Sequence, residues 1–384
     1  MTRSLRANCA IVGTAESDLG VVAPGMSPTD LMAQATVRAL DDCGLQLSDV
    51  DALLTATSQS RMAALSLCEY LGVQPTYFDS TQIGGSSFMA HVAHVQAAIE
   101  AGQCEVAVVC YGSTQRSVGR STASVREPNA YEDPYRPMMP VSAYALAASR
   151  HMHQYGTTRE NLAEVAVAAR QWAKLNPQAF RRDDLSIDDV LSAPRVSHPF
   201  TVRDCCLVTD GGGAIVLTSA ARAKDLKHTP AYVLGTGECI SHSMITSMPD
   251  LAVSGAAHSG PIAFKEAGVK PADIDVLELY DAFTYNTMVF LEDLGYCAKG
   301  EGGDFVSGGR IAPGGELAVN TNGGGLSYCH PGMYGLFLLI EAARQIHGVC
   351  GERQIDDVNL ALAHGNGGVL SSQCTVILGN DTVL

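Results

Sequence analysis

The sequence predicts an α/β protein built from two equivalent halves, with a long insertion before the last strand of the first half. Apolar strands alternate with apolar-faced helices along most of the 384 residues. The segment 39–54, ALDDCGLQLSDVDALL, matches 263–278, AFKEAGVKPADIDVLE, without a gap. After each copy come a strand, a connecting segment, a Gly-rich turn, a helix and a further strand in the same order, which indicates an internal duplication.

The first half begins with an apolar strand and alternates regularly after it. Its predicted elements are strand Cys9–Thr14, a helix from about Pro28 to Cys43, strand Ala52–Thr57, a helix from about Phe88 to Ala101 and strand Val106–Tyr111. In the fourth element, alanines between Phe88, Val92 and Val95 leave hardly any polar face, so this helix is expected to be buried.

A buried helix needs partners for its first N–H groups, which makes Gly84-Gly85-Ser86-Ser87 the candidate floor of an active site. The alternative is a Gly-rich turn in which Ser86 caps the helix.

A long segment then interrupts the first half. Residues 113–199 begin with Arg, Tyr, Pro and Met and become helical, with Asn161–Ala173 carrying the only tryptophan, Trp172. Such a segment is either a functional lid or a flexible linker, and we interpret it as a packed cap. We therefore expect three units: 1–112 with 200–225 as the first half, 113–199 as the cap, and 226–384 as the second half.

Thr209–Ser219 is predicted to return to the first half as a strand, and Ala231–Gly235 starts the second half. The later elements expected are strand Leu277–Phe283 (LELYDAF), the Gly-rich segment NTNGGGLSYCHPGMYG, helix Leu336–Ile346 and strand Leu360–His364.

Composition narrows the possible partners. The net charge of −15 argues against nucleic acid or an anionic membrane as the main partner. No apolar run reaches eighteen residues and the N-terminus lacks a signal-peptide pattern, so we expect a cytoplasmic protein without a membrane span. The twelve cysteines form no CxxC pair, so we expect no metal site and no disulfide framework.

Five stretches in this order resemble the thiolase superfamily: YGTTRENLAEVAVAARQWAKLNP, LSIDDVLSAP, DGGGAIVLTS, LELYDAF and NTNGGGLSYCHP. They are most similar to sterol-carrier-protein-X-type thiolases and the lipid-transfer-protein aldolases related to them. The resemblance implies a thiolase fold, with a duplicated αβαβα five-layer core and an inserted cap domain. It also implies acyl-CoA substrates, with CoA as part of the substrate and no further cofactor.

The nucleophile of a thiolase is missing. The resemblance places the acyl-accepting cysteine near Gly85, but no cysteine occurs between Cys68 and Cys104. Glycine cannot carry an acyl group, so ordinary thiolase turnover is not expected. Ser86 and Ser87 lack the G-x-S-x-G setting of a nucleophile, and helix capping explains them more simply.

The chain resembles steroid side-chain aldolases that also lack this cysteine. The resemblance implies retro-aldol cleavage of a β-hydroxyacyl-CoA, a reaction that needs only proton transfer and enolate stabilisation. The YD-x-F motif then implies Tyr280 as the proton-transfer residue, and Cys-His-Pro implies His330 as an enolate-oxygen donor. A second acid or base could be Tyr328 or Tyr334, and His364 could reach the site or cap a turn. We expect Gly85, Ser86, Asp281, Asn320 and Gly324 to contact the acyl-CoA substrate.

Two alternatives remain open at this stage. One is a noncanonical thiolase or acyltransferase that uses Cys329 beside His330, and the other is a non-catalytic scaffold subunit. The resemblance further implies a homodimer core and a separate small subunit with an OB-fold and a zinc ribbon, giving a hetero-tetramer. The identity of the acyl group, the assignment of acid and base, the stereochemistry and activity without a partner are not readable from the sequence.

Overall fold

The computed structural model describes residues 5–119 and 129–384. Residues 1–4 of the predicted first half and 120–128 of the predicted cap lie outside this range. The strands of the first half are β1 (Cys9–Glu16), β2 (Ala52–Thr55), β3 (Tyr77–Asp79), β4 (Val106–Ser113) and β7 (Gly211–Ser219). Those of the second half are β8 (Ala231–Ile240), β9 (Val276–Leu279), β10 (Ala318–Val319), β11 (Leu360–Gly367) and β12 (Ser372–Gly379).

These strands form a ten-stranded sheet in the order β10-β9-β11-β12-β8-β1-β7-β4-β2-β3. Read outward from its centre, each half has the same strand order and the same pattern of parallel and antiparallel pairs. The halves join through β1 and β8, where Ala10 faces Tyr232 and Ile11 faces Ala231. The duplicated fold expected from the sequence is therefore confirmed.

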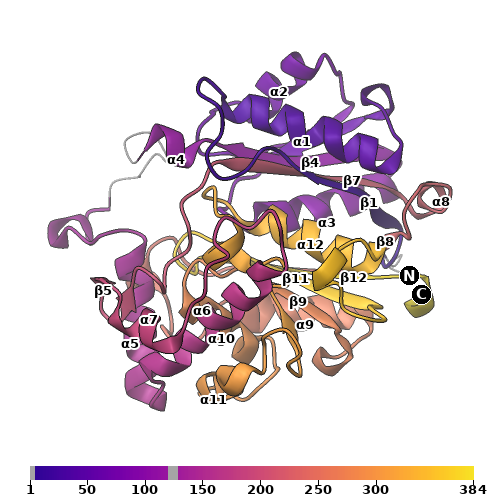
Figure 1. The fold of residues 1–384 in the computed structure, drawn as a ribbon. Coiled ribbons are helices and arrows are strands. Elements are labelled where there is room, and N and C mark those ends of the chain that lie inside the picture. Colours follow the sequence, from indigo (N-terminus) through magenta and orange to yellow (C-terminus); the bar gives the residue numbers. More distant parts are fainter. Residues whose placement is uncertain (1–4, 120–128) are drawn as a thin grey trace.

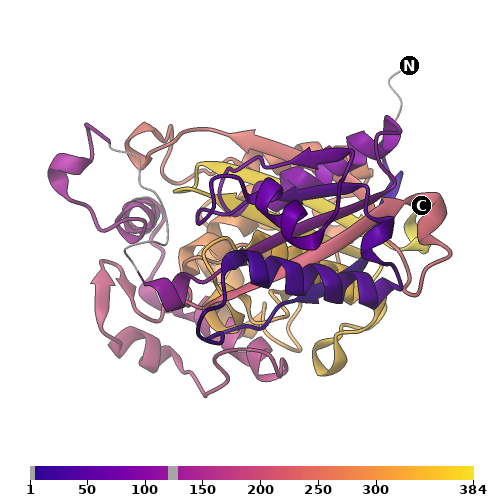
Figure 2. The same cartoon turned by 90° about the horizontal axis from the view of Figure 1, so that it is seen from above.

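Helices separate and cover the two half-sheets, giving five layers (Figures 1 and 2). The main ones are α1 (Pro28–Cys43), α2 (Ala63–Leu71), α3 (Ser87–Glu100), α9 (Ala256–Ala267), α10 (Thr284–Asp293) and α12 (Gly335–His347), with shorter α8 (Ala220–Ala223) and α11 (Gly302–Val306). The outer layers are α1 on the first half-sheet and α9 on the second. Between the half-sheets lie α3 and α12, which pack against each other and against strands of both halves. The start of α3 is therefore buried at the centre of the molecule.

The repeated segment has the same structural role in both halves: it ends a helix and binds the start of a strand. Gly44 and Gly268 end α1 and α9 in the left-handed conformation, which glycine adopts without strain. The Asp51 carboxylate accepts hydrogen bonds from the amides of Glu105 and Val106 at the start of β4. The Asp275 carboxylate binds the amides of 359 and 360 at the start of β11 in the same way. The matching residues are thus those that set helix ends and strand starts.

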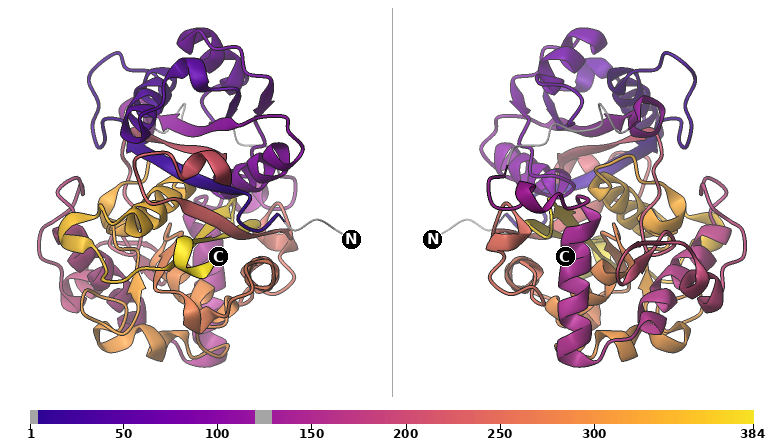
Figure 3. Two further views of the ribbon diagram at one scale, coloured as in Figure 1. Left: turned by 90° about the vertical axis from the view of Figure 1, so that its right-hand side faces the viewer. Right: turned by 90° about the vertical axis from the view of Figure 1, so that its left-hand side faces the viewer.

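The segment that follows β4 contributes four helices and a two-stranded ribbon at one side of the body. They are α4 (Gln115–Val118), α5 (Val141–Tyr155), α6 (Arg159–Lys174), α7 (Ile187–Ser192), β5 (Arg195–Ser197) and β6 (Phe200–Thr201). Helix α5 runs along the outside of the second half (magenta in Figure 3, right). It is fastened there by His151, whose Nε2 lies 3.0 Å from an oxygen of Glu292. The predicted helix around Trp172 is confirmed as part of α6, and its indole N–H donates to the Ile311 carbonyl. The boundaries of the three predicted units stay a prediction.

Two local expectations were wrong. The strand predicted to reach Phe283 ends at Leu279, because the main chain then turns out of the sheet: the Ala282 carbonyl accepts from Cys206. Ser86 does not cap α3, since its hydroxyl points away from the helix amides and donates to the Ile83 carbonyl at 3.1 Å. In the part of the chain that the structure describes, no helix is both long and apolar enough to cross a membrane.

Candidate active site

Tyr280 and His330 meet in the centre of the candidate site. Tyr280 directly follows β9, and its amide donates to the His364 carbonyl at 3.0 Å, which continues the sheet by one residue. The Tyr280 hydroxyl lies 3.2 Å from His330 Nε2 and 3.3 Å from the Gly332 carbonyl oxygen. It also accepts from the Tyr334 amide at 3.0 Å. The two side chains are 4 % and 7 % exposed, so a proton can pass between them with little water present.

Burial keeps both groups neutral near pH 7. It raises the pKa of Tyr280 well above 10, opposed by the hydrogen bond from Tyr334. It also lowers the pKa of His330 to about 4. A neutral imidazole beside a neutral phenol can accept the proton of the phenol while the phenol oxygen takes up a proton from another group. The pair is therefore suited to moving a proton to and from a bound molecule.

Gly85 supports the ring of Tyr280. A Cβ atom at position 85 would lie 2.1 Å from Tyr280 Cε2 and 2.7 Å from the Asn366 carbonyl oxygen. No side chain fits without moving the ring or the main chain. The place where the resemblance expects an acyl-accepting cysteine is thus filled by the phenol ring of Tyr280.

Asp281, Asn320 and Gly324 contact one another beneath this pair. The Asp281 carboxylate is fully buried and accepts from the amides of Gly325 at 2.6 Å and Leu326 at 3.2 Å. Asn320 Oδ1 accepts from the Leu279 amide at 2.7 Å. A Cβ at Gly324 would lie 2.0 Å from an Asp281 oxygen, so only glycine allows this approach. Burial raises the pKa of Asp281 to about 7, against the opposing effect of these hydrogen bonds.

The two predicted serines, Ser86 and Ser87, lie beside Gly85, but their hydroxyl groups form hydrogen bonds with other residues. The Ser86 hydroxyl lies 2.6 Å from the Ser372 hydroxyl. The Ser87 hydroxyl accepts from the Ile83 amide at 2.9 Å and donates to the Gly84 carbonyl. Both serines therefore hold the turn that precedes α3 against the β12 strand and its own main chain.

The structure does not bring the other proposed acid or base groups to Tyr280. Tyr334 offers only its amide, because its hydroxyl donates to Asn322 Oδ1 at 2.8 Å. The Tyr328 hydroxyl donates to Glu16 at 2.7 Å, on a carboxylate that Arg344 also binds. The imidazole of His364 lies 2.9 Å from both Thr375 Oγ1 and Gln373 Oε1. These three side chains have complete partners outside the Tyr280–His330 pair.

Cys329 lacks the properties of a nucleophile. Its thiol is 1 % exposed, and burial raises its pKa well above 9, helped by the charges of Glu16 and Asp281. A thiol of this kind carries no thiolate at neutral pH. The acyltransferase alternative therefore has no activated cysteine at this position.

Three residues of the site had not been singled out from the sequence. Tyr144 of α5 accepts a hydrogen bond from Asn366 Nδ2 at 2.7 Å and donates to the Gly368 carbonyl at 2.9 Å. Its ring centroid lies 4.6 Å from that of Phe283. Asn366 stands two residues after the predicted strand Leu360–His364, in a Gly-rich stretch that was a usable signal. Tyr144 comes from the cap and Cys206 from the segment that follows it, and both reach the site only through tertiary packing.

A pocket of about 500 Å³ opens next to the loop that carries Cys206. Arg181, Arg203 and Cys206 are among the residues that line it. Cys206 donates its amide to the Ala282 carbonyl, so the floor of the pocket touches the segment that carries Tyr280. Within the described residues, no ion pair holds Arg181 or Arg203, and both lower the pKa of Arg170, a shift led by burial. Asp184 and Asp189 line the same pocket, so it carries two groups of each charge and borders the site at Cys206.

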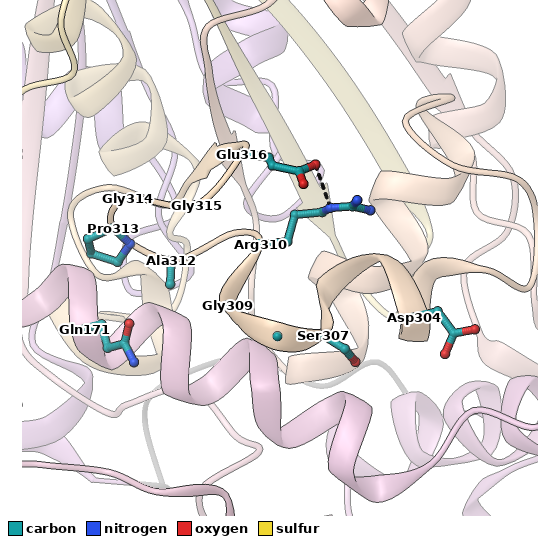
Figure 4. Close-up of a pocket in the computed structure, with 11 residues that line it drawn as sticks. Gln171, Asp304, Ser307, Gly309, Arg310, Ala312, Pro313, Gly314, Gly315 and Glu316 are labelled. Atoms are coloured by element: carbon teal, nitrogen blue, oxygen red, sulfur yellow. Dashed lines mark ion pairs between the residues drawn. The ribbon is translucent and has the colours of Figure 1, made fainter.

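A larger cavity of about 600 Å³ lies elsewhere, between Gln171 of α6 and the loop 304–316 (Figure 4). It is polar, and Arg310 pairs there with Glu316 at 2.9 Å. None of the predicted site residues lines it.

Comparisons with known proteins agree with this geometry. The family model described as thiolase, N-terminal domain, matches residues 9–185, and that described as thiolase C-terminal domain-like matches 237–380. The chain is 34 % identical over 365 residues to 17-hydroxy-3-oxo-4-pregnene-20-carboxyl-CoA lyase of Mycobacterium tuberculosis, covering 90 % of this chain and 92 % of the relative. It is 33 % identical over 377 residues to a steroid side-chain-cleaving aldolase of Thermomonospora curvata, covering 93 % and 94 %.

Solved structures give the same result. A structure described as Ltp2-ChsH2(DUF35) aldolase superposes with a TM-score of 0.88 at 30 % identity, covering 99 % of both chains. Human mitochondrial 3-ketoacyl-CoA thiolase superposes with a TM-score of 0.73 at 17 % identity, covering 99 % of this chain and 100 % of that one. The second likeness concerns the fold alone.

Proposed function

This chain belongs to the thiolase family, and from that premise we propose that it is a carbon–carbon lyase acting on acyl-CoA. It cleaves a β-hydroxyacyl-CoA by a retro-aldol reaction into a ketone or aldehyde and a shorter acyl-CoA. The observation that carries the proposal is the phenol ring of Tyr280 against Gly85, because it removes the place of a thiolase nucleophile. A retro-aldol reaction needs no acyl-enzyme, and the two relatives at 33–34 % identity are a lyase and an aldolase.

In the proposed mechanism the Tyr280 oxygen takes the proton of the substrate's β-hydroxyl group while its own proton passes to His330 Nε2. The Cα–Cβ bond then breaks, the β-oxygen becomes the carbonyl of the product, and the electron pair moves into the thioester enolate. Return of the proton from His330 to the enolate carbon completes the shorter acyl-CoA. Burial disfavours a lone imidazolium, as the lowered pKa of His330 shows, but it also leaves the attraction between that imidazolium and the neighbouring enolate poorly screened by water.

The substrate is an acyl-CoA with a bulky hydrophobic acyl group, and a steroid side chain is the form that the names of the relatives suggest. Arg181 and Arg203 line the pocket at Cys206 together with Asp184 and Asp189, and these two guanidinium groups are the candidates for binding the phosphate groups of CoA. No other cofactor enters the mechanism.

Partner subunits belong to the proposal. The structural neighbour is described as a complex with a DUF35 protein, which supports a separate small OB-fold and zinc-ribbon subunit for this chain and a hetero-tetramer around a homodimer. The dimer contact is expected at β3, an edge strand where Phe78 is 69 % exposed and Met62 and Leu65 are exposed nearby. Co-expression with a neighbouring small subunit, followed by mass measurement of the purified complex, tests both contacts. A cytoplasmic location remains a prediction.

Tyr280 and His330 also argue against the alternative of a non-catalytic scaffold subunit. A scaffold has no need of a tyrosine and a histidine in mutual contact at 3.2 Å with their other partners supplied by main-chain groups. The arrangement favours an enzyme.

Single-turnover cleavage of a tertiary β-hydroxyacyl-CoA by the complex tests the function. Wild type is expected to release ketone and a shorter acyl-CoA, and Tyr280→Phe is expected to lose about 10²–10⁴-fold in rate, the usual contribution of a proton-transfer group. Acyl transfer to CoA without carbon–carbon cleavage would contradict the proposal.

A further inference from the structure

Asn286 is a buried amide without a partner. It lies in the first turn of α10, three residues after Phe283, and is 0 % exposed. Neither its Nδ2 nor its Oδ1 meets a hydrogen-bond partner among the described residues. Burying an unpaired amide opposes folding, so a side chain of this kind usually serves something other than stability.

The polar neighbours of Asn286 bond to other groups and leave its amide outside hydrogen-bond geometry. The Asn286 amide interacts with the Tyr144 hydroxyl and opposes the rise of its pKa to about 12 that burial causes, but the two groups do not meet hydrogen-bond geometry. The single proton of that hydroxyl is directed to the Gly368 carbonyl, and Asn366 Nδ2 donates to its oxygen. Asn366 Oδ1 in turn accepts from Gln373. The Asn286 donor is therefore unpaired beside a cluster in which the donors of Tyr144, Asn366 and Gln373 are paired.

This cluster borders the candidate active site. The Asn366 carbonyl is one of the atoms that would meet a Cβ at Gly85, beside the ring of Tyr280. Cys206 lies beside the segment that joins Tyr280 to this cluster, because its amide donates to the Ala282 carbonyl and the ring of Phe283, the next residue, lies 4.6 Å from that of Tyr144. Cys206 also lines the pocket of about 500 Å³, so this pocket borders the segment that carries Tyr280 and Asn286.

The charges of the proposed reaction identify what Asn286 would bind. The Tyr280 hydroxyl already has the Tyr334 amide, His330 and the Gly332 carbonyl as neighbours. These groups suffice to accept the proton of the β-hydroxyl group. Cleavage also places negative charge on the thioester oxygen, for which the site needs a neutral, desolvated donor. We propose that Asn286 Nδ2 donates a hydrogen bond to the thioester oxygen of the bound acyl-CoA and to the enolate oxygen that replaces it. The inference rests on the proposed function and adds a catalytic residue to it.

Asn286→Leu tests the proposal because it keeps the volume and removes the amide. The matched control is Thr287→Val, on the next residue, whose buried hydroxyl also lacks a partner. We expect Asn286→Leu to lower kcat about 10²–10³-fold with KM changed little, the effect of losing one such donor. Its melting temperature should be unchanged or higher, and Thr287→Val should keep kcat. Full activity in Asn286→Leu, or a loss that follows a lower melting temperature, would overturn the assignment.

A binding measurement separates this inference from the proposed function. The probes are the shorter acyl-CoA product and its thioether analogue, which lacks the carbonyl oxygen. By calorimetry, wild type should bind the thioester about tenfold more tightly, the value of one hydrogen bond to a buried donor, and Asn286→Leu should bind both alike. If wild type shows the preference without cleaving any β-hydroxyacyl-CoA, the proposed function fails and the donor role stands. If Asn286→Leu keeps the preference, the donor role fails.

Discussion

Gly85→Ala should disable the enzyme through the ring of Tyr280. The added Cβ would lie 2.1 Å from Tyr280 Cε2, where ordinary contact begins at 3.4 Å. The ring must therefore move by more than about 1 Å, since the Asn366 carbonyl on the other side of the Cβ belongs to a buried strand. A shift of that size breaks the contact of the phenol with Gly332, now 3.3 Å, and lengthens those with His330 and Tyr334.

The expected magnitude follows from that displacement. Misplacing a catalytic group by 1 Å costs about 10²-fold in rate, and overpacking a core costs about 1–3 kcal/mol of stability. We expect kcat to fall about 100-fold in Gly85→Ala, measured by single-turnover cleavage. Ala98→Val is the control, because it overpacks the far end of the same helix, where Ala98 is buried. It should lose comparable stability and keep kcat.

A double-mutant cycle decides whether Tyr280 carries the effect. In the Tyr280→Phe background the phenol oxygen is already gone, so adding Gly85→Ala should cost little more in rate. Additive losses in the cycle, or a Gly85→Ala variant with kcat within about threefold of wild type, would refute the steric reasoning.

Three further outcomes are expected. Cys329→Ser should retain most of the cleavage activity, measured as kcat, because the thiol is neutral and buried; complete loss would restore the acyltransferase alternative. Asp281 binds its proton more tightly in the folded chain, where burial raises its pKa from 3.8 to about 7. Its contribution to stability is therefore full below pH 4 and lost as the pH rises through 7. The melting temperature of wild type relative to the non-titrating Asp281→Asn should fall between pH 4 and 8, and a constant difference would contradict this titration. Arg344→Met should lower the free energy of unfolding by about 3–5 kcal/mol in urea, because it leaves Glu16 as a buried unpaired charge. Glu16→Gln/Arg344→Met should recover part of that loss, and a double variant no more stable than Arg344→Met would argue against a buried charge as the cause.

The fold could be predicted from sequence because its signals are local and occur twice. Helix-ending glycines and strand-capping aspartates stand at matching places in both copies, and each acts within its own neighbourhood, as Asp51 and Asp275 do. The motifs also led to Tyr280 and His330. Side-chain direction could not be predicted in the same way. Tyr328 and Tyr334 flank His330 in sequence, but a single turn of π-helix and the loop after it send their hydroxyls to Glu16 and Asn322.

The steric dependence between Gly85 and Tyr280 was equally hidden, because the two residues are far apart in the chain and meet only when the half-sheets are stacked. Asn286 gave no signal at all. An asparagine early in an apolar helix becomes informative only when the structure shows that its buried amide has no hydrogen-bond partner.

The strand order has a consequence for the synthesis of this chain. β1 leaves the ribosome about 200 residues before its partners β7 and β8. At ordinary translation rates it waits about 10–40 s as an apolar segment with free edges. During that time the rest of the first half and the cap emerge without a complete sheet to join. The N-terminal strand is therefore the part of the nascent chain most in need of chaperone protection, and a product truncated before β7 should aggregate rather than fold.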